Sequence, residues 1–168
     1  MPLQTKVTLS AAPGVPGDKA TPDQSVHTPL NPLAEAALPV GGFVFPVIED
    51  GVTDNTRATN VAGSATEVLG FVERVINYVN YDVFSDGTLT VPRGSALTVA
   101  VRGDYWAVSS TAATVGQAVL ASTADGSIST GTPDATHLDT GWVVKTAGAA
   151  GEPIIISNWN ALTRPAAA

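Results

Sequence analysis

The sequence contains no cysteine, one methionine and only two histidines among its 168 residues. Without cysteine the chain cannot form disulfides, thiolate zinc sites or iron–sulfur clusters, and it has no cysteine nucleophile. Two histidines are too few for a histidine-rich metal centre. We therefore expect neither a metal site nor another cofactor.

Charge is scarce as well, because Asp, Glu, Lys and Arg make up only 14% of the chain, against about 25% in an ordinary soluble domain. Eight basic and 15 acidic residues give a formal net charge of −7. A protein that binds a phosphate backbone needs a basic surface, so direct binding to nucleic acid is not expected. The hydrophobic share of 44% is sufficient for a buried core.

Long apolar runs are also missing. The longest uncharged apolar stretch, 36–48, is shorter than the about 20 residues of a membrane helix, and it is interrupted by Pro39 and Pro46. Residues 1–14 lack the charged and apolar regions of a signal peptide. The sequence therefore predicts a soluble protein without a membrane partner, synthesised in a reducing cytoplasm.

Proline is abundant in one part of the chain, since seven of the 12 prolines lie within the first 39 residues. Proline fixes its own φ and holds the preceding residue in an extended conformation. Residues 1–38 are therefore predicted to form an extended arm, with one helical turn at 33–37. The arm precedes a core domain at 39–160 and a tail at 161–168. Two interpretations of the arm stay open: a disordered tail, or a segment that orders only against a partner.

From residue 40 onward, short runs rich in Val, Ile, Thr and aromatic residues alternate with clusters of Gly, Asp, Asn and Ser. This pattern predicts an all-β fold, a small β-barrel or sandwich. Asp-Gly pairs at 50–51, 86–87 and 125–126 suit turns that need a positive φ. The predicted strands are 42–48, 67–75, 77–84, 88–91, 97–109, 117–122, 140–146 and 153–159.

Motifs that would indicate catalysis are missing from the sequence. His27 and His137 have no nucleophile or acid at a suggestive spacing, and both are interpreted as exposed side chains. The sequence has no G-x-S-x-G, HExxH, P-loop or G-x-G-x-x-G pattern. The chain is therefore predicted not to be an enzyme.

Acidic and aromatic residues are the remaining candidates for a binding site. The acidic clusters lack the spacing of a calcium loop and are interpreted as solvated turn residues. The tryptophans fall within predicted strands, which favours packing in a core or interface over stacking on a sugar. The acids are Glu49, Asp50 and Asp54 in one turn and Asp82 and Asp86 in another; the tryptophans are Trp106, Trp142 and Trp159.

Several short segments, taken in order, resemble the capsid decoration proteins of tailed bacteriophages, also called structural cement proteins. Together they cover about residues 40–159, and their order and spacing carry the resemblance. The segments are VGGFV at 40–44, LGFVER at 69–74, VPRGSALTV at 91–99, RGDYWAV at 102–108, VGQAV at 115–119, ADGS at 124–127, TGWVV at 140–144, and GE at 151–152 ahead of IIISNW at 154–159.

The resemblance implies a non-enzymatic β-rich protein that binds the major capsid protein on the outer surface of the virion and stabilises the head. It also implies self-association, with a trimer favoured and a dimer as the second choice. Scarce charge suits such a protein, because the cores of large interfaces are depleted in charged residues. The capsid-contact candidates are apolar residues of the arm: Leu3, Val7, Leu9, Val26, Leu30 and Leu33.

Two departures from the expected family pattern concern the arm and one side chain. The arm is longer than the family leads us to expect. Glu73 stands where a histidine is expected, a change predicted to alter only a local polar contact. Two alternative functions stay open: a virion or cell-surface β-rich module that binds carbohydrate or mediates adhesion, and a β-rich enzyme of unknown type.

Overall fold

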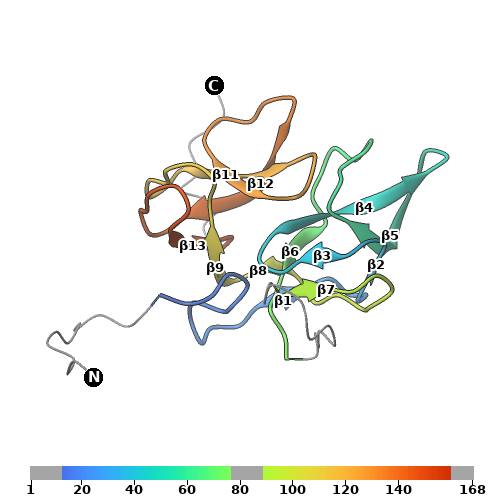
Figure 1. Ribbon diagram of the computed structural model, residues 1–168, viewed down its shortest axis with the longest axis horizontal. Coiled ribbons are helices and arrows are strands. Elements are labelled where there is room, and N and C mark those ends of the chain that lie inside the picture. Colours follow the sequence, from blue (N-terminus) through green and yellow to red (C-terminus); the bar gives the residue numbers. More distant parts are fainter. Residues whose placement is uncertain (1–12, 77–88, 160–168) are drawn as a thin grey trace, which may run out of the picture.

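The computed structural model describes residues 13–76 and 89–159, and within them the chain forms thirteen strands and no helix (Figure 1). The predicted all-β class is confirmed, and the described residues include no helix able to cross a membrane. The predicted strand at 77–84 lies outside the described residues. The strands are β1 (Val26–His27), β2 (Leu33–Ala34), β3 (Leu38–Pro39), β4 (Phe43–Glu49), β5 (Val52–Thr59), β6 (Gly70–Val72), β7 (Thr90–Val91), β8 (Val99–Arg102), β9 (Asp104–Val108), β10 (Ala118–Ser122), β11 (Ile128–Thr130), β12 (His137–Val144) and β13 (Pro153–Ser157).

Two sheets and a two-stranded ribbon make up the fold. Six strands are hydrogen-bonded in the order β1-β8-β6-β4-β5-β2, five in the order β11-β10-β12-β13-β9, and β3 pairs with β7. The five-stranded sheet lies on the left of Figure 1 and the six-stranded sheet on the right. Ser109, which directly follows β9, forms a β-bridge with Ile128 of β11. Because β9 and β11 are the two edge strands of the five-stranded sheet, this bridge brings the two edges together.

The larger core cluster lies between the two sheets and is built around four aromatic rings. Phe43, Phe71, Tyr105 and Trp142 are all buried, and their neighbouring ring centroids are 5.2 to 6.1 Å apart. Such separations and tilted orientations are favourable for aromatic pairs. This packing joins strands β4, β6, β9 and β12, and therefore both sheets.

The second core cluster lies on the other face of the six-stranded sheet. Because side chains alternate along a strand, β4 contributes Phe43 and Phe45 to the first cluster and Val44 to the second. β4 and β6 are therefore covered on both faces. The second cluster consists of Ala34, Leu38, Val44, Ala58, Val72, Val91, Leu97 and Val99.

The predicted strand at 97–109 is wrong in one respect, because the chain turns a corner at Gly103. β8 ends before this residue in the six-stranded sheet, and β9 begins after it in the five-stranded sheet. Gly103 has a φ of 148°, and a Cβ at this position would lie 2.6 Å from the Tyr105 ring. Glycine therefore allows the change of sheet at this point.

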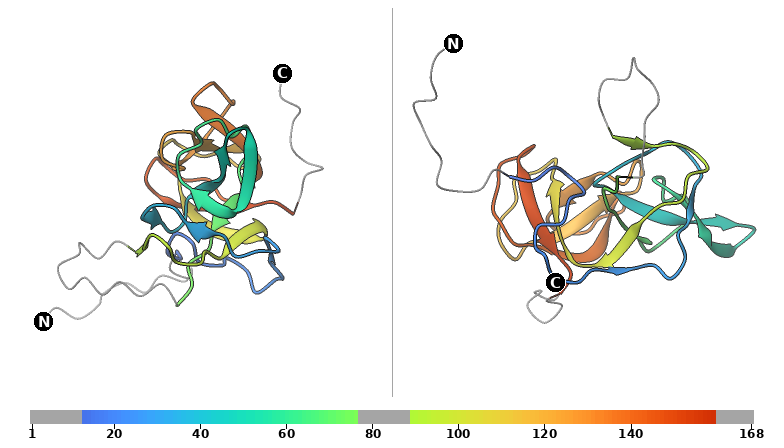
Figure 2. Two further views of the ribbon diagram at one scale, coloured as in Figure 1. Left: turned by 90° about the vertical axis from the view of Figure 1, so that its right-hand side faces the viewer. Right: turned by 90° about the horizontal axis from the view of Figure 1, so that it is seen from below.

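The described part of the arm is extended and pairs with strands of its own chain. Val26 pairs with Arg102 of β8, and the Thr28 N–H donates to the Val99 carbonyl at 3.0 Å. Further along, β2 pairs in parallel with β5 at the opposite edge of the sheet. The arm therefore contacts both edges of the curled six-stranded sheet, and the view from below in Figure 2 shows it running alongside β8.

This course corrects two expectations about residues 13–38. The predicted helical turn at 33–37 is wrong, because Leu33–Ala34 forms β2. The segment is also neither a free tail nor dependent on a partner for order, since its backbone bonds to remote strands and Ala34 and Leu38 are buried. Strands of two residues leave no periodic pattern in a sequence, so these pairings could not be predicted locally.

Other predicted strands agree with the structure apart from their limits. The stretches 42–48, 117–122 and 153–159 correspond to β4, β10 and β13, whereas β6 covers only the middle of 67–75 and β12 begins before residue 140. β5 is absent from the predicted strands because six of its eight residues, VTDNTRAT, are polar and do not alternate with apolar ones. It is recognisable only as the partner of β4.

Candidate interaction surface

The arm presents apolar side chains to solvent on the outside of the six-stranded sheet. Val26, Leu30 and Leu33 are 44%, 55% and 48% exposed, whereas Ala34 is buried against the core. These three are the capsid-contact candidates that the structure describes, and they lie on the segment that runs from β1 to β2, the two edge strands of the six-stranded sheet. Leu3, Val7 and Leu9 lie outside the described residues.

A buried carboxylate holds the arm against the core. Glu73, which directly follows β6, lies with one oxygen 2.5 Å from His27 Nε2 and accepts a hydrogen bond from the Tyr105 hydroxyl at 2.9 Å. Its other oxygen lies 3.6 Å from Lys19 Nζ. Burial raises the pKa of the Tyr105 hydroxyl, and the adjacent Glu73 raises it further, so Tyr105 stays a hydrogen-bond donor.

This cluster revises two expectations. His27 was interpreted as an exposed side chain, but it is hydrogen-bonded to Glu73. Glu73 was expected to alter only a local contact, but its partners are 32 to 54 residues away in sequence, at Tyr105, His27 and Lys19. The departure from the family pattern at position 73 is the only signal of this cluster in the sequence. The partners of Glu73 come from distant segments, so no local pattern identifies them.

Replacing Glu73 with glutamine is expected to lower the free energy of unfolding by about 1–3 kcal/mol, the range for hydrogen bonds that involve charged groups. The change removes the negative charge that Lys19 and His27 face while preserving the side-chain shape. Urea unfolding followed by tryptophan fluorescence measures the difference. Glu67→Gln is the matched control, since Glu67 is exposed and should leave the stability within about 0.5 kcal/mol of wild type. Equal losses in the two variants would contradict a special role for Glu73.

A second polar cluster joins the arm to the hairpin formed by β4 and β5. The Arg57 guanidinium contacts Glu35 of the arm at 2.7 Å, Glu49 at 2.8 Å and Asp54 at 2.8 Å. Hydrogen bonds from Thr56, and then from Arg57, lower the pKa of Asp54 to about 2. The pKa of Glu49 is lowered by the same guanidinium. Arg57 therefore links the arm to both strands of the hairpin.

The three acidic residues of the first predicted turn, Glu49, Asp50 and Asp54, thus differ in their contacts. Asp50 is exposed at the tip as expected, whereas Asp54 and Glu49 are bound to Arg57. Asp82 and Asp86 lie outside the described residues. In the part of the chain that the structure describes, no three His, Asp or Glu side chains are close enough together to hold a metal ion.

Lowering the pH from about 4 to about 2 is expected to destabilise the fold. Asp54 and Asp134 both have a pKa of about 2 in the folded protein, below the ordinary 3.8, and Asp134 owes this first to hydrogen bonds from Thr136. A lowered folded-state pKa stabilises the protein above the unfolded-state pKa, and this stabilisation is lost as the pH falls through the folded-state pKa.

Urea midpoints measured between pH 2 and pH 5 test this pH dependence. The midpoint should fall below about pH 4 in the wild type and fall less steeply in Asp54→Asn. The double variant with Asp134→Asn should give a still flatter profile. Parallel profiles for all three proteins would show that these carboxylates do not account for the acid sensitivity.

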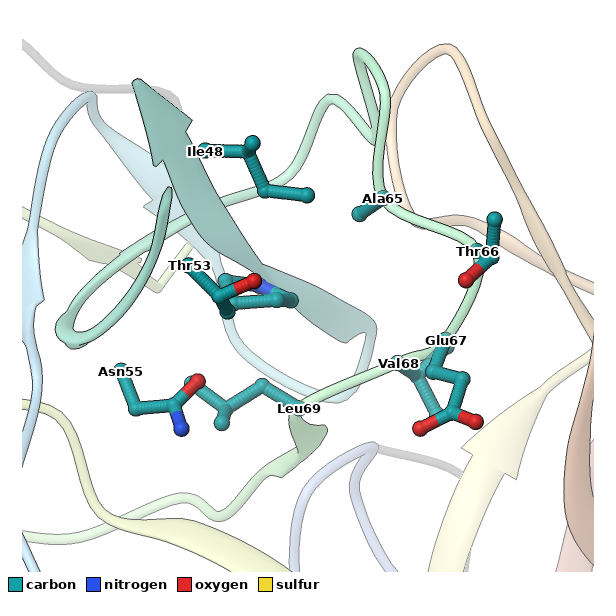
Figure 3. A pocket seen from close by; sticks show the side chains of 9 residues that line it. Ile48, Thr53, Asn55, Ala65, Thr66, Glu67, Val68 and Leu69 are labelled. Carbon is teal, nitrogen blue, oxygen red and sulfur yellow. The ribbon is translucent and has the colours of Figure 1, made fainter. Parts of the chain in front are cut away.

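The β4–β5 hairpin projects from the six-stranded sheet at the upper right of Figure 1. Asp50 and Gly51 form its two-residue turn with φ values of 51° and 76°, as the Asp-Gly pair predicted. One flank of the hairpin and the segment 65–69 enclose a groove of about 320 Å³. Figure 3 shows the side chains that line it: Pro46, Ile48, Thr53, Asn55, Ala65, Thr66, Glu67, Val68 and Leu69.

The tryptophans divide between core and surface. Trp142 is buried among the aromatic rings, as the sequence predicted, whereas Trp106 is partly buried and Trp159 is 42% exposed. His137, interpreted from the sequence as an exposed side chain, begins β12 and is partly buried, and its Nδ1 contacts Asp134 at 3.1 Å. The groove was not predicted, because its two sides belong to segments that have no shared sequence pattern.

Comparison with known proteins gives a family match and similar solved structures. The family model described as "Structural cement protein (E217 gp24/Pam3 gp6)" matches residues 3–158. A chain from the capsid of Myoviridae phage XM1 has a similar fold, with a TM-score of 0.63 and 15% identity over 94% of this chain and 98% of that chain. A chain of the head fiber gp8.5 N base of bacteriophage phi29 gives a TM-score of 0.40 and 10% identity over 75% and 88% of the two chains. No curated protein gives a significant match.

Proposed function

This chain belongs to the phage structural cement protein family, and from that premise we propose that it binds the major capsid protein on the outer surface of the head. Its role is that of a capsid-associated structural protein, and we propose no catalytic activity. In this proposal the protein is synthesised in the host cytoplasm, joins the assembled shell, and strengthens contacts between shell subunits.

The observation that carries the proposal is the exposure of three apolar side chains on the arm. Val26, Leu30 and Leu33 are exposed, although the backbone that bears them is hydrogen-bonded to the core. A segment already ordered in the free protein loses little further entropy on binding. Exposed apolar side chains on a backbone-bonded segment therefore suit a protein that must bind a large shell.

We further propose that copies associate with one another on the shell, with a trimer favoured over a dimer. Linked copies that each contact the shell are held much more strongly than a single copy, because every further contact forms at a high local concentration. Modest contacts from each arm would then suffice for firm attachment.

Co-sedimentation with mature heads that lack the protein tests the proposal. Wild-type protein is expected to bind and to raise the temperature at which the heads open. The double variant Leu30→Asp/Leu33→Asp should bind at least tenfold more weakly, since carboxylates would be desolvated at the contact. Val115→Asp is the matched control, because Val115 is 66% exposed but lies outside the arm.

Two results would count against the proposal. Failure of the wild-type protein to sediment with the heads would refute shell binding itself. Equal binding by the arm variant and the Val115→Asp control would instead remove Leu30 and Leu33 from the contact. Circular dichroism of each variant establishes that any loss of binding does not come from loss of fold.

A further inference from the structure

The groove beside the β4–β5 hairpin is bordered by an unpaired strand edge. The Leu69 N–H donates to the Val44 carbonyl at 2.8 Å, and β4 pairs with β6 at Phe43 and Val44. Beyond this point, among the described residues, no backbone hydrogen bond joins the segment 65–68 to β4. The two segments diverge there and leave the groove of about 320 Å³ between them (Figure 3).

The backbone of Ile48 is directed toward this open edge. Glu49 and Val52 close the two-residue turn, so their backbone groups face each other across the hairpin. Because these groups alternate in direction along an antiparallel strand, the N–H and carbonyl of Ile48 face the groove. Pro46 lacks an N–H and therefore suits such an edge.

We propose that this edge binds residues 3–9 of a second copy of the chain as an added β-strand. In that segment Leu3, Thr5, Val7 and Leu9 alternate with Gln4, Lys6 and Thr8. This alternation places every apolar side chain of the segment on one face of a strand. The partly buried Ile48, Val68 and Leu69 supply an apolar lining for that face.

The charges of the segment and the groove are complementary. Lys6 is the only basic residue among the first 18 of a chain whose net charge is −7. Glu67 lines the groove and is exposed, and Asp50 is exposed at the tip of the adjacent hairpin. A strand that carries one lysine therefore meets an acidic rim and an apolar floor.

The position of the arm favours a neighbouring copy over the same chain. Gly17 donates to the Trp106 carbonyl of β9 at 2.8 Å, so the described arm begins beside the five-stranded sheet. In Figure 1 this start and the β4–β5 hairpin lie at opposite ends of the long axis. The proposal gives Leu3, Val7 and Leu9 a second copy as partner in place of the shell, and it does not depend on the shell contact proposed above.

Engineered disulfides test the contact cleanly because the chain contains no cysteine. Full-length Val7→Cys is mixed with full-length Asn55→Cys that carries a mass tag, and the mixture is oxidised in solution. Asn55 is exposed and lines the groove. The mixed disulfide is expected to form at least ten times faster than in a mixture of Val7→Cys with Val115→Cys, whose cysteine lies outside the groove. Thr66→Cys provides a second groove position and should behave like Asn55→Cys.

Either of two outcomes would overturn the proposal. The first is a mixed-disulfide rate no greater than that of the Val115→Cys control for both groove variants. The second is a Val7→Cys/Asn55→Cys double variant that forms its disulfide within one chain at a rate independent of protein concentration. Thr8→Cys, on the other face of the predicted strand, should react with Asn55→Cys more slowly than Val7→Cys does.

Discussion

Replacing Trp142 with alanine is expected to lower the free energy of unfolding by about 3–5 kcal/mol, the usual range for removing a buried large aromatic side chain. Trp142 is 1% exposed, and its ring lies 5.8 to 6.1 Å from those of Phe71, Tyr105 and Phe43. Because these rings come from both sheets, the cavity left by alanine would weaken the contact between the sheets. Equilibrium unfolding in urea, followed by circular dichroism, measures the loss.

Trp159→Ala is the matched control, since it removes the same side chain from a position that is 42% exposed. Its effect should be within about 1 kcal/mol of wild type, because half-exposed side chains lose little burial on truncation. Similar losses for the two variants would mean that the inter-sheet aromatic cluster is not the main source of cohesion between the sheets.

Gly126→Ala is expected to be the most damaging of the single-methyl additions, costing about 3 kcal/mol or more. Gly126 has a φ of 69°, and its carbonyl accepts a hydrogen bond from the Phe43 N–H at 2.9 Å. An added Cβ would overlap the Phe43 carbonyl oxygen. The turn after β10 would therefore have to move away from β4, and the hydrogen bond that connects the two sheets would be strained.

Gly141→Ala separates this overlap from the cost of the backbone conformation alone. Gly141 has a similar φ of 76°, but a Cβ there has no neighbouring atom within 4 Å. Its cost should be limited to about 1–2 kcal/mol, the penalty of a left-handed conformation for alanine. Thermal unfolding of the two variants provides the comparison, and equal midpoints would contradict the predicted overlap.

These two positions illustrate what could be predicted from the sequence. The Asp125-Gly126 pair predicted a turn that needs a positive φ, and that part is confirmed. The proximity of Phe43 could not be predicted, because Phe43 lies 83 residues away in the chain. Likewise, the position of Trp142 in a predicted strand indicated packing in a core or interface, but not which rings surround it.

The candidate interaction surface could likewise be predicted from the sequence only in part. Val26, Leu30 and Leu33 could be chosen as candidates from their apolar character in a proline-rich arm, and their role in shell contact stays a prediction. The division into an arm at 1–38, a core at 39–160 and a tail at 161–168 also stays a prediction. The contacts of Glu73 and Arg57 and the presence of the groove could not be predicted from the sequence, because each depends on which distant segments meet.

Composition, alternating apolar residues and turn chemistry determined the all-β class, most of the long strands and the extended character of the arm. These features are local, because a strand period or an Asp-Gly turn is encoded by adjacent residues. The tertiary structure alone decided that the arm contacts both edges of one sheet, that Glu73 and Arg57 hold it there, and that β4 has an open edge beside a groove. Those features depend on hydrogen bonds and ion pairs between segments far apart in sequence, whose free energy is realised only when the chain has folded.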